Sequence, residues 1–149
     1  MSDNSFISIE LHQQQDYRFE ARFGAPVAPL VCDEPPPLGA AAGPSPVELL
    51  CAAVANCLSD SLLFALRKFK QAPEPLSCKV TAEVGRNAEG RVRVLAMTAR
   101  LQLGVAAAEL LHLERVLSQF ESYCTVTQSV GQGIAITVQV WDATGTQLK

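Results

Sequence analysis

The sequence predicts an α+β fold in which a long central helix packs against a curved antiparallel sheet. Alternating polar and apolar residues near both ends of the chain indicate strands, one long segment is apolar on nearly every face, and a second apolar stripe has helical spacing. The expected order of elements is β-β-β-α-β-β-α-β. At 149 residues, the chain is expected to form a single domain, residues 1–149.

The first part of the chain has a strand pattern. Apolar side chains alternate in residues 5–12 and again in residues 16–23, where Arg18 and Arg22 lie on the polar face, so the two segments are expected to form a hairpin. A short third strand is expected at residues 29–33. The Pro- and Gly-rich loop that follows has the length of loops that line a site or an interface.

The start of the central helix carries its own signals. Ser45 is a suitable N-cap, Pro46 suits the first helical position, and Glu48 completes an S-x-x-E capping box. The helix is expected to continue to about Lys70, before two prolines. From residue 47 to 57 it is apolar all round, which is typical of an enclosed helix.

The second half of the chain contains further strands and one more predicted helix. Strands are expected at residues 78–84, 91–103 and 134–140, with a tight hairpin between the first two. A switch in apolar parity predicts a bulge or a sharp twist near Val94 and Leu95. The second helix is expected from about Ala106 to Ser122, and its apolar stripe continues to Cys124.

Composition excludes several classes of function. The net charge of −3 and the scattered basic residues do not fit a nucleic-acid or anionic membrane partner. The N-terminus lacks the pattern of a signal peptide, and the apolar run from Val47 to Leu58 is too short to span a bilayer, so a cytoplasmic protein with reduced thiols is expected. There is no C-x-x-C motif, and His12 and His112 are not near paired cysteines, so neither a metal nor a cofactor is expected.

Two of the five cysteines could be reactive. Cys57 lies where the central helix first turns polar, so it is either a small core residue or a thiol at the edge of the core. Asp60, on the same face, would oppose ionisation of that thiol unless a cation lies nearby. Cys124 either seals the end of the second helix or meets Cys57 there.

The other candidate residues have structural explanations. Cys51 is expected to pack in the core, and Cys32 and Cys78 to lie on strands or strand edges. The capping box accounts for Glu48. Arg18 and Arg22 are either solvated strand residues or a source of the cation that Cys57 needs.

Two segments together resemble the OsmC/Ohr family of osmotically inducible and organic hydroperoxide resistance proteins. They are GPSPVELLCAAVANC, which contains Cys57, and FESYCTVTQSVGQGIAITVQV, which contains Cys124, 67 residues further on. The resemblance extends from about residue 17 to 142. It implies an intertwined homodimer with active sites at the interface.

The resemblance also implies an activity. Enzymes of this family reduce organic hydroperoxides, and the matching positions here are Cys57 as the reactive cysteine and Cys124 as the resolving cysteine. An external dithiol or lipoyl-type reductant would restore both thiols. Arg22 is the preferred counterpart of the arginine that the family places beside its thiolate, with Arg18 as the second choice. Glu48 stands closest to the position of the glutamate that orients this arginine.

The sequence departs from the hydroperoxide-resistance branch at two positions. Val47 occupies the position of the family glutamate, with Glu48 one residue later, and Thr125 rather than proline follows Cys124. The sequence is closer to OsmC-like branches, and the missing glutamate predicts weak or altered activity. The alternatives are a dimeric protein that binds a small apolar or acyl ligand or senses redox state, and, more weakly, a hydrolase with a cysteine nucleophile.

Overall fold

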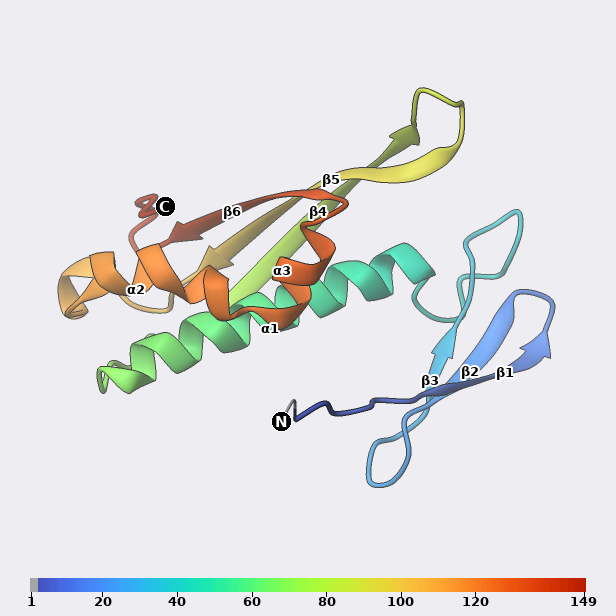
Figure 1. Ribbon diagram of the computed structural model, residues 1–149, viewed down its shortest axis with the longest axis horizontal. Coiled ribbons are helices and arrows are strands. Elements are labelled where there is room, and N and C mark those ends of the chain that lie inside the picture. Colours follow the sequence, from blue (N-terminus) through green and yellow to red (C-terminus); the bar gives the residue numbers. More distant parts are fainter. Residues whose placement is uncertain (1–2) are drawn as a thin grey trace. The chain divides into compact units, whose positions relative to one another are not determined.

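The computed structural model describes residues 3–149 and has an α+β architecture, as the sequence predicts (Figure 1). Its contacts group the chain into two compact units, residues 1–49 and 50–149, and the boundary falls within the long helix. In chain order the elements are β1 (Glu10–Gln15), β2 (Arg18–Arg22), β3 (Leu30–Cys32), α1 (Pro46–Lys68), β4 (Ser77–Arg86), β5 (Val92–Gln102), η1 (Ala107–Glu109), α2 (Leu113–Gln119), η2 (Phe120–Tyr123), α3 (Thr125–Val130) and β6 (Ala135–Trp141).

The first unit contains an antiparallel sheet with the strand order β1-β2-β3. The first strand begins at Glu10, later than the expected residue 5. Glu10 pairs with Arg22, the last residue of β2, so the residues before it have no strand to pair with. Phe6 and Ile7 in this unpaired segment are more than nine-tenths exposed.

The loop between β3 and α1 is organised around a buried carboxylate. Asp33 is only 3% exposed and accepts hydrogen bonds from the backbone N–H groups of Glu34, Ala40 and Ala42, at 2.9, 3.1 and 3.0 Å. Gly43 passes so close to β3 that a Cβ atom there would lie 1.9 Å from the carbonyl oxygen of Val31. The loop is therefore folded back on its own strand, and it requires glycine at this position.

The start of α1 forms the predicted capping box. The Glu48 carboxylate accepts the N–H of Ser45 at 2.7 Å, and the Ser45 hydroxyl accepts the N–H of Glu48 at 3.4 Å. The helix ends at Lys68, two residues before the expected end, and Lys70 has a left-handed backbone with φ of 57°.

The buried face of α1 forms the centre of the second unit. Four fully buried residues follow one stripe of the helix and pack into a core with the sheet and the later helical segments. They are Val54, Leu58, Leu62 and Leu66.

By length and composition alone, α1 is long and apolar enough to cross a membrane, whereas the sequence analysis expects its apolar run to be too short for that.

The second unit contains a sheet with the order β4-β5-β6. Glu83 pairs with Ala96 and Val84 with Val94, which leaves Leu95 as the extra residue, so the predicted bulge is confirmed. One pairing differs from the antiparallel expectation, because β6 runs parallel to β5. The helical segments between these strands provide the long connection that parallel pairing needs.

The predicted helix from Ala106 to Ser122 is wrong as a single element. The chain forms η1, α2 and η2 instead, with a break at His112, which has a left-handed φ of 59°. The Leu111 N–H leaves the helical pattern and donates to the side chain of Gln71 at 2.8 Å. The apolar stripe is nevertheless buried, with Phe120 and Cys124 fully enclosed.

Candidate active site

Cys57 lies midway along α1, at the edge of the core of the second unit. Its side chain is half-buried and packs against the buried cluster. Asp60 in the next turn is exposed, whereas Leu58 beside Cys57 is fully buried. The predicted position of Cys57 between the core and a more polar face is therefore observed, and the residue is not fully enclosed.

Cys124 lies in the short junction between η2 and α3, with no exposed surface. Its thiol donates a hydrogen bond to the hydroxyl oxygen of Thr127 at 2.9 Å, and its carbonyl oxygen accepts the N–H of Gln128 at 2.9 Å. Sequence analysis missed both α3 and the role of Thr127. Thr127 is three residues after Cys124, a spacing at which a polar side chain can meet the residue that begins a helix.

The fold brings the thiols of Cys57 and Cys124 together. Cys57 lies close enough to Cys124 to affect its ionisation, and both cysteines are free thiols. Burial raises the pKa of Cys124, and the interaction with Cys57 raises it further, while the bonds from Thr127 act in the opposite direction. Two thiols separated by 67 residues in the sequence thus share one small polar site inside an apolar core.

The other three cysteines have different surroundings. Cys78 on β4 is half-buried near the Ser59 hydroxyl, and burial raises its pKa. Cys32 on β3 is buried, with its thiol directed to the carbonyl oxygen of Leu30 at 3.8 Å. Cys51 packs against the core, as predicted.

The charged residues considered for the site belong to the first unit. Arg22 is exposed and forms an ion pair with Glu20 at 2.7 Å. Arg18 is less exposed, its Nε lies 4.0 Å from Asp33, and that buried nitrogen has no hydrogen-bond partner among the described residues. Bonds from Ser45 lower the pKa of Glu48, so its carboxylate is held by the capping box, and no ion pair of the described chain joins it to either arginine.

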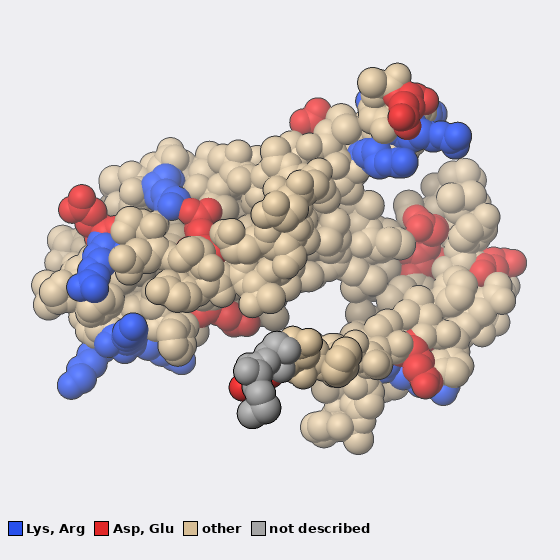
Figure 2. All heavy atoms as spheres, in the orientation of Figure 1, with Lys and Arg blue, Asp and Glu red and all other residues tan. Residues whose placement is uncertain are grey.

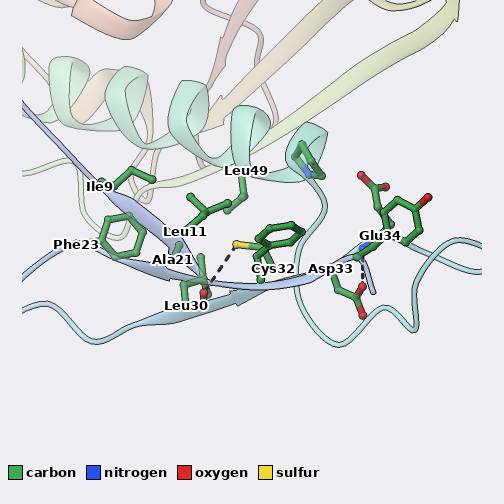
Figure 3. A pocket seen from close by; sticks show the side chains of 12 residues that line it. Ile9, Leu11, Ala21, Phe23, Leu30, Cys32, Asp33, Glu34 and Leu49 are labelled. Atoms are coloured by element: carbon green, nitrogen blue, oxygen red, sulfur yellow. Dashed lines mark hydrogen bonds between the residues drawn. The ribbon is translucent and has the colours of Figure 1, made fainter. Parts of the chain in front are cut away.

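The sheet of the first unit forms one wall of an open apolar pocket of about 490 Å³ (Figure 3). Side chains from all three strands and from Leu49 in the first turn of α1 face this space. Several of them are large and partly exposed, which is unusual for a sheet face that meets only water. The apolar lining consists of Ile9, Leu11, Tyr17, Phe19, Ala21, Phe23, Leu30, Cys32, Pro46 and Leu49.

Comparison with known proteins identifies the family. A sequence description of the OsmC-like protein family matches residues 39–139. An OsmC-like protein of unknown function from Vibrio cholerae has a similar structure, with 18% identity, coverage of 92% of this chain and 99% of that one, and a TM-score of 0.77.

Two similar structures carry functional names. An organic hydroperoxide resistance protein from Legionella pneumophila has 15% identity, coverage of 93% and 98%, and a TM-score of 0.69. The organic hydroperoxide resistance protein OhrB of Bacillus subtilis has 11% identity, coverage of 91% and 98%, and a TM-score of 0.67. No curated protein sequence matches this one. The similar structures support the fold alone, but the family match covers most of the chain, and the chain therefore belongs to the OsmC-like family.

Proposed function

We propose that the chain is a thiol-dependent peroxidase that reduces organic hydroperoxides with Cys57 and Cys124. The observation that carries this proposal is the contact between the two thiols. Two cysteines used only for packing would have no need to meet at a shared polar site. Structural similarity to proteins named for organic hydroperoxide resistance adds support for the substrate class.

The proposed reaction is a two-electron reduction of the peroxide. The Cys57 thiolate attacks one peroxide oxygen, the O–O bond breaks, and the departing alkoxide takes a proton to become an alcohol. The sulfur of Cys57 is now a sulfenic acid. The sulfur of Cys124 attacks it, hydroxide leaves as water with the proton of the Cys124 thiol, and a disulfide forms. An external dithiol, for example of the lipoyl type, reduces the disulfide and is itself oxidised.

The environments of the two thiols support their assigned roles. Cys57 is partly exposed, so a peroxide can reach it, whereas Cys124 is fully enclosed. A negative charge on Cys57 raises the pKa of Cys124, and burial acts in the same direction. Both effects favour the protonated form of Cys124, which suits the proposed role of a resolving thiol.

An arginine is proposed to stabilise the Cys57 thiolate. Sequence reasoning favours Arg22, but Glu20 already neutralises that guanidinium at the surface. We propose Arg18 instead, because its buried Nε has no hydrogen-bond partner among the described residues. Since Glu48 serves as a helix cap, we propose that it orients the arginine only indirectly, by fixing the start of α1.

We also propose that the protein works as a cytoplasmic homodimer. A second copy of the chain would cover the partly exposed apolar face of β1, β2 and β3 (Figure 3). The peroxide and the external reductant are the further expected partners, and neither a nucleic acid nor a membrane is expected.

The test is consumption of cumene hydroperoxide by the purified reduced protein with an excess of a dithiol. The unchanged protein should consume the peroxide, and Cys57→Ser should reduce the rate to that of the buffer. Cys78→Ser is the matched control, because it removes another half-buried thiol of the same unit, and it should retain the full rate. Equal rates for the unchanged protein and Cys57→Ser would refute the proposal and leave the ligand-binding alternative.

A further inference from the structure

The segment that follows β6 folds back onto the second unit. The backbone N–H of Leu148 donates to the carbonyl oxygen of Val140 at 2.8 Å, and Trp141 forms an isolated antiparallel bridge with Gln147. The Leu148 side chain packs against the buried core. These contacts fix the position of Lys149, the next residue, beside the end of α2 (Figure 1).

The side chain of Lys149 connects α2 with η2. Its ammonium group donates a hydrogen bond to the carbonyl oxygen of Leu117 at 2.9 Å, and it forms an ion pair with the carboxylate of Glu121. Leu117 lies in the last turn of α2, where carbonyl groups lack helical partners and a nearby cation is favourable. The side chains of Lys149 and Glu121 are only 32% and 28% exposed, so salt screens this pair less than it would a fully exposed pair.

This ion pair stands apart from the other charges of the second unit. Charged side chains cover only small, separate areas of the visible face of that unit (Figure 2). Among the described residues, no other ion pair involves η1, α2, η2 or α3. The pair of Lys149 and Glu121 is therefore a specific connection between the segment after β6 and η2.

Glu121 also holds the backbone around Cys124. Its carbonyl oxygen accepts the N–H of Cys124 at 3.0 Å and the side-chain amide of Gln128 at 3.0 Å. The same glutamate thus contacts Lys149 through its carboxylate and the proposed resolving cysteine through its carbonyl group. Because η2 is a short 3₁₀ turn, whose hydrogen bonds have poorer geometry than those of an α-helix, its position depends on such outside contacts.

We propose that Lys149 and Glu121 are positioning residues that hold Cys124 where its sulfur can attack the oxidised Cys57, an inference that rests on the proposed function. In that step the Cys124 sulfur attacks the sulfur of the Cys57 sulfenic acid and a disulfide forms. Hydroxide leaves and takes the proton of the Cys124 thiol to become water. A disulfide needs the two Cα atoms within about 7 Å and the side chains directed toward each other. Loss of the ion pair therefore slows this step, whereas the attack of Cys57 on the peroxide does not involve η2.

The test separates the two steps of the reaction. The reduced full-length protein is mixed with one equivalent of cumene hydroperoxide without a reductant, and rapid quenching followed by mass spectrometry measures peroxide consumption and disulfide formation. Lys149→Gln should slow disulfide formation about three- to tenfold, the effect of one partly exposed ion pair and one hydrogen bond, and leave peroxide consumption unchanged. Glu121→Gln should slow the same step. The double variant should be no slower than the slower single variant, because both changes remove the same contact.

Two further variants serve as controls. Lys149→Arg keeps the positive charge and the donors, so it should restore most of the rate of disulfide formation. Lys79→Gln removes an exposed lysine of the same unit that forms no ion pair among the described residues, and it should change neither step. An unchanged rate of disulfide formation in Lys149→Gln, equal slowing of both steps, or equal slowing by Lys79→Gln would each overturn the inference.

A second measurement needs no peroxide. Hydrogen exchange at the backbone amides of Cys124 and Gln128, followed by NMR, reports local opening of η2 and the start of α3. Lys149→Gln should speed exchange at these two amides and not at those of β5, which would also change if the whole unit were destabilised. If exchange is faster in this way while the unchanged protein consumes no peroxide, the positioning of Cys124 stands and the peroxidase proposal fails. If peroxide is consumed while Lys149→Gln alters neither disulfide formation nor exchange, the peroxidase stands and the inference fails.

Discussion

Cys124 and Cys78 are two thiols of the same unit with different neighbours, and Cys124 is fully buried whereas Cys78 is half-buried. Burial raises the pKa of both. Cys78 faces the hydroxyl of Ser59, whereas Cys124 contacts a second thiol and the hydroxyl of Thr127. Burial alone keeps a thiol protonated and inert. Under the proposed function, Cys124 is redox-active because a second sulfur lies within reach, and Cys78 is not because its neighbour is a hydroxyl.

Replacement of Cys124 by serine tests the comparison most severely. Cys124→Ser leaves Cys57 able to react once with peroxide, but no thiol remains to form the disulfide. We expect one equivalent of cumene hydroperoxide to be consumed rapidly, after which a stable sulfenic acid accumulates on Cys57 and turnover with a dithiol falls steeply. Mass spectrometry after trapping with dimedone measures the sulfenic acid.

The matching change at the other thiol is Cys78→Ser, which should show no trapped sulfenic acid during turnover. A disulfide between Cys57 and any cysteine other than Cys124 in the oxidised protein would contradict the assignment of the pair.

The architecture could be read from the sequence where local pattern and tertiary contact agree. The capping box at Ser45 and Glu48 and the bulge at Leu95 both have short-range causes and were predicted correctly. The break at His112 was not predicted. It depends on the left-handed backbone of His112 and on the hydrogen bond from the Leu111 N–H to the side chain of Gln71, 40 residues away in the chain. An apolar stripe shows which side chains are buried, and it does not show whether the helix is continuous.

The site was predicted unevenly for a similar reason. The resemblance selected Cys57 and Cys124, and the structure brings them into contact. The sequence could not reveal that Thr127 would bond to Cys124, or that Asp33 would anchor a loop through three backbone bonds, because both depend on how loops fold back. The sequence preferred Arg22 to Arg18, but the two arginines share a strand face, and only the structure shows how they differ in exposure and in partners.

The hydroxyl of Thr127 offers a finer test of what distinguishes Cys124. Its hydrogen bond lowers the pKa of Cys124 and opposes the effect of burial. Thr127→Val keeps the shape and removes the bond, so the pKa of Cys124 should rise and less of it should be thiolate at neutral pH. We expect disulfide formation to slow by about 2- to 10-fold, the value of one hydrogen bond, with no change in the reaction of Cys57 with peroxide.

The pH dependence checks the cause of this effect. Because the variant has the higher pKa, its deficit should be largest at neutral pH and should disappear at alkaline pH, where both proteins have ionised Cys124. Rapid-mixing measurements of the two steps across the pH range separate them. A deficit that stays constant with pH would mean that Thr127 acts by packing rather than through the thiol.

The smallest effect is expected at Cys78, where the comparison predicts a structural role alone. Cys78→Ala removes a half-buried side chain from β4, and we expect the free energy of unfolding to fall by about 1 kcal/mol, as for an ordinary substitution of this size. Peroxide consumption should be unchanged, because no second sulfur is paired with this position. Chemical denaturation and the cumene hydroperoxide assay measure the two quantities on one preparation. If Cys78→Ala left stability unchanged and reduced turnover, the purely structural role of Cys78 would be contradicted. Cys78 would then take part in the redox cycle although its neighbour is a hydroxyl.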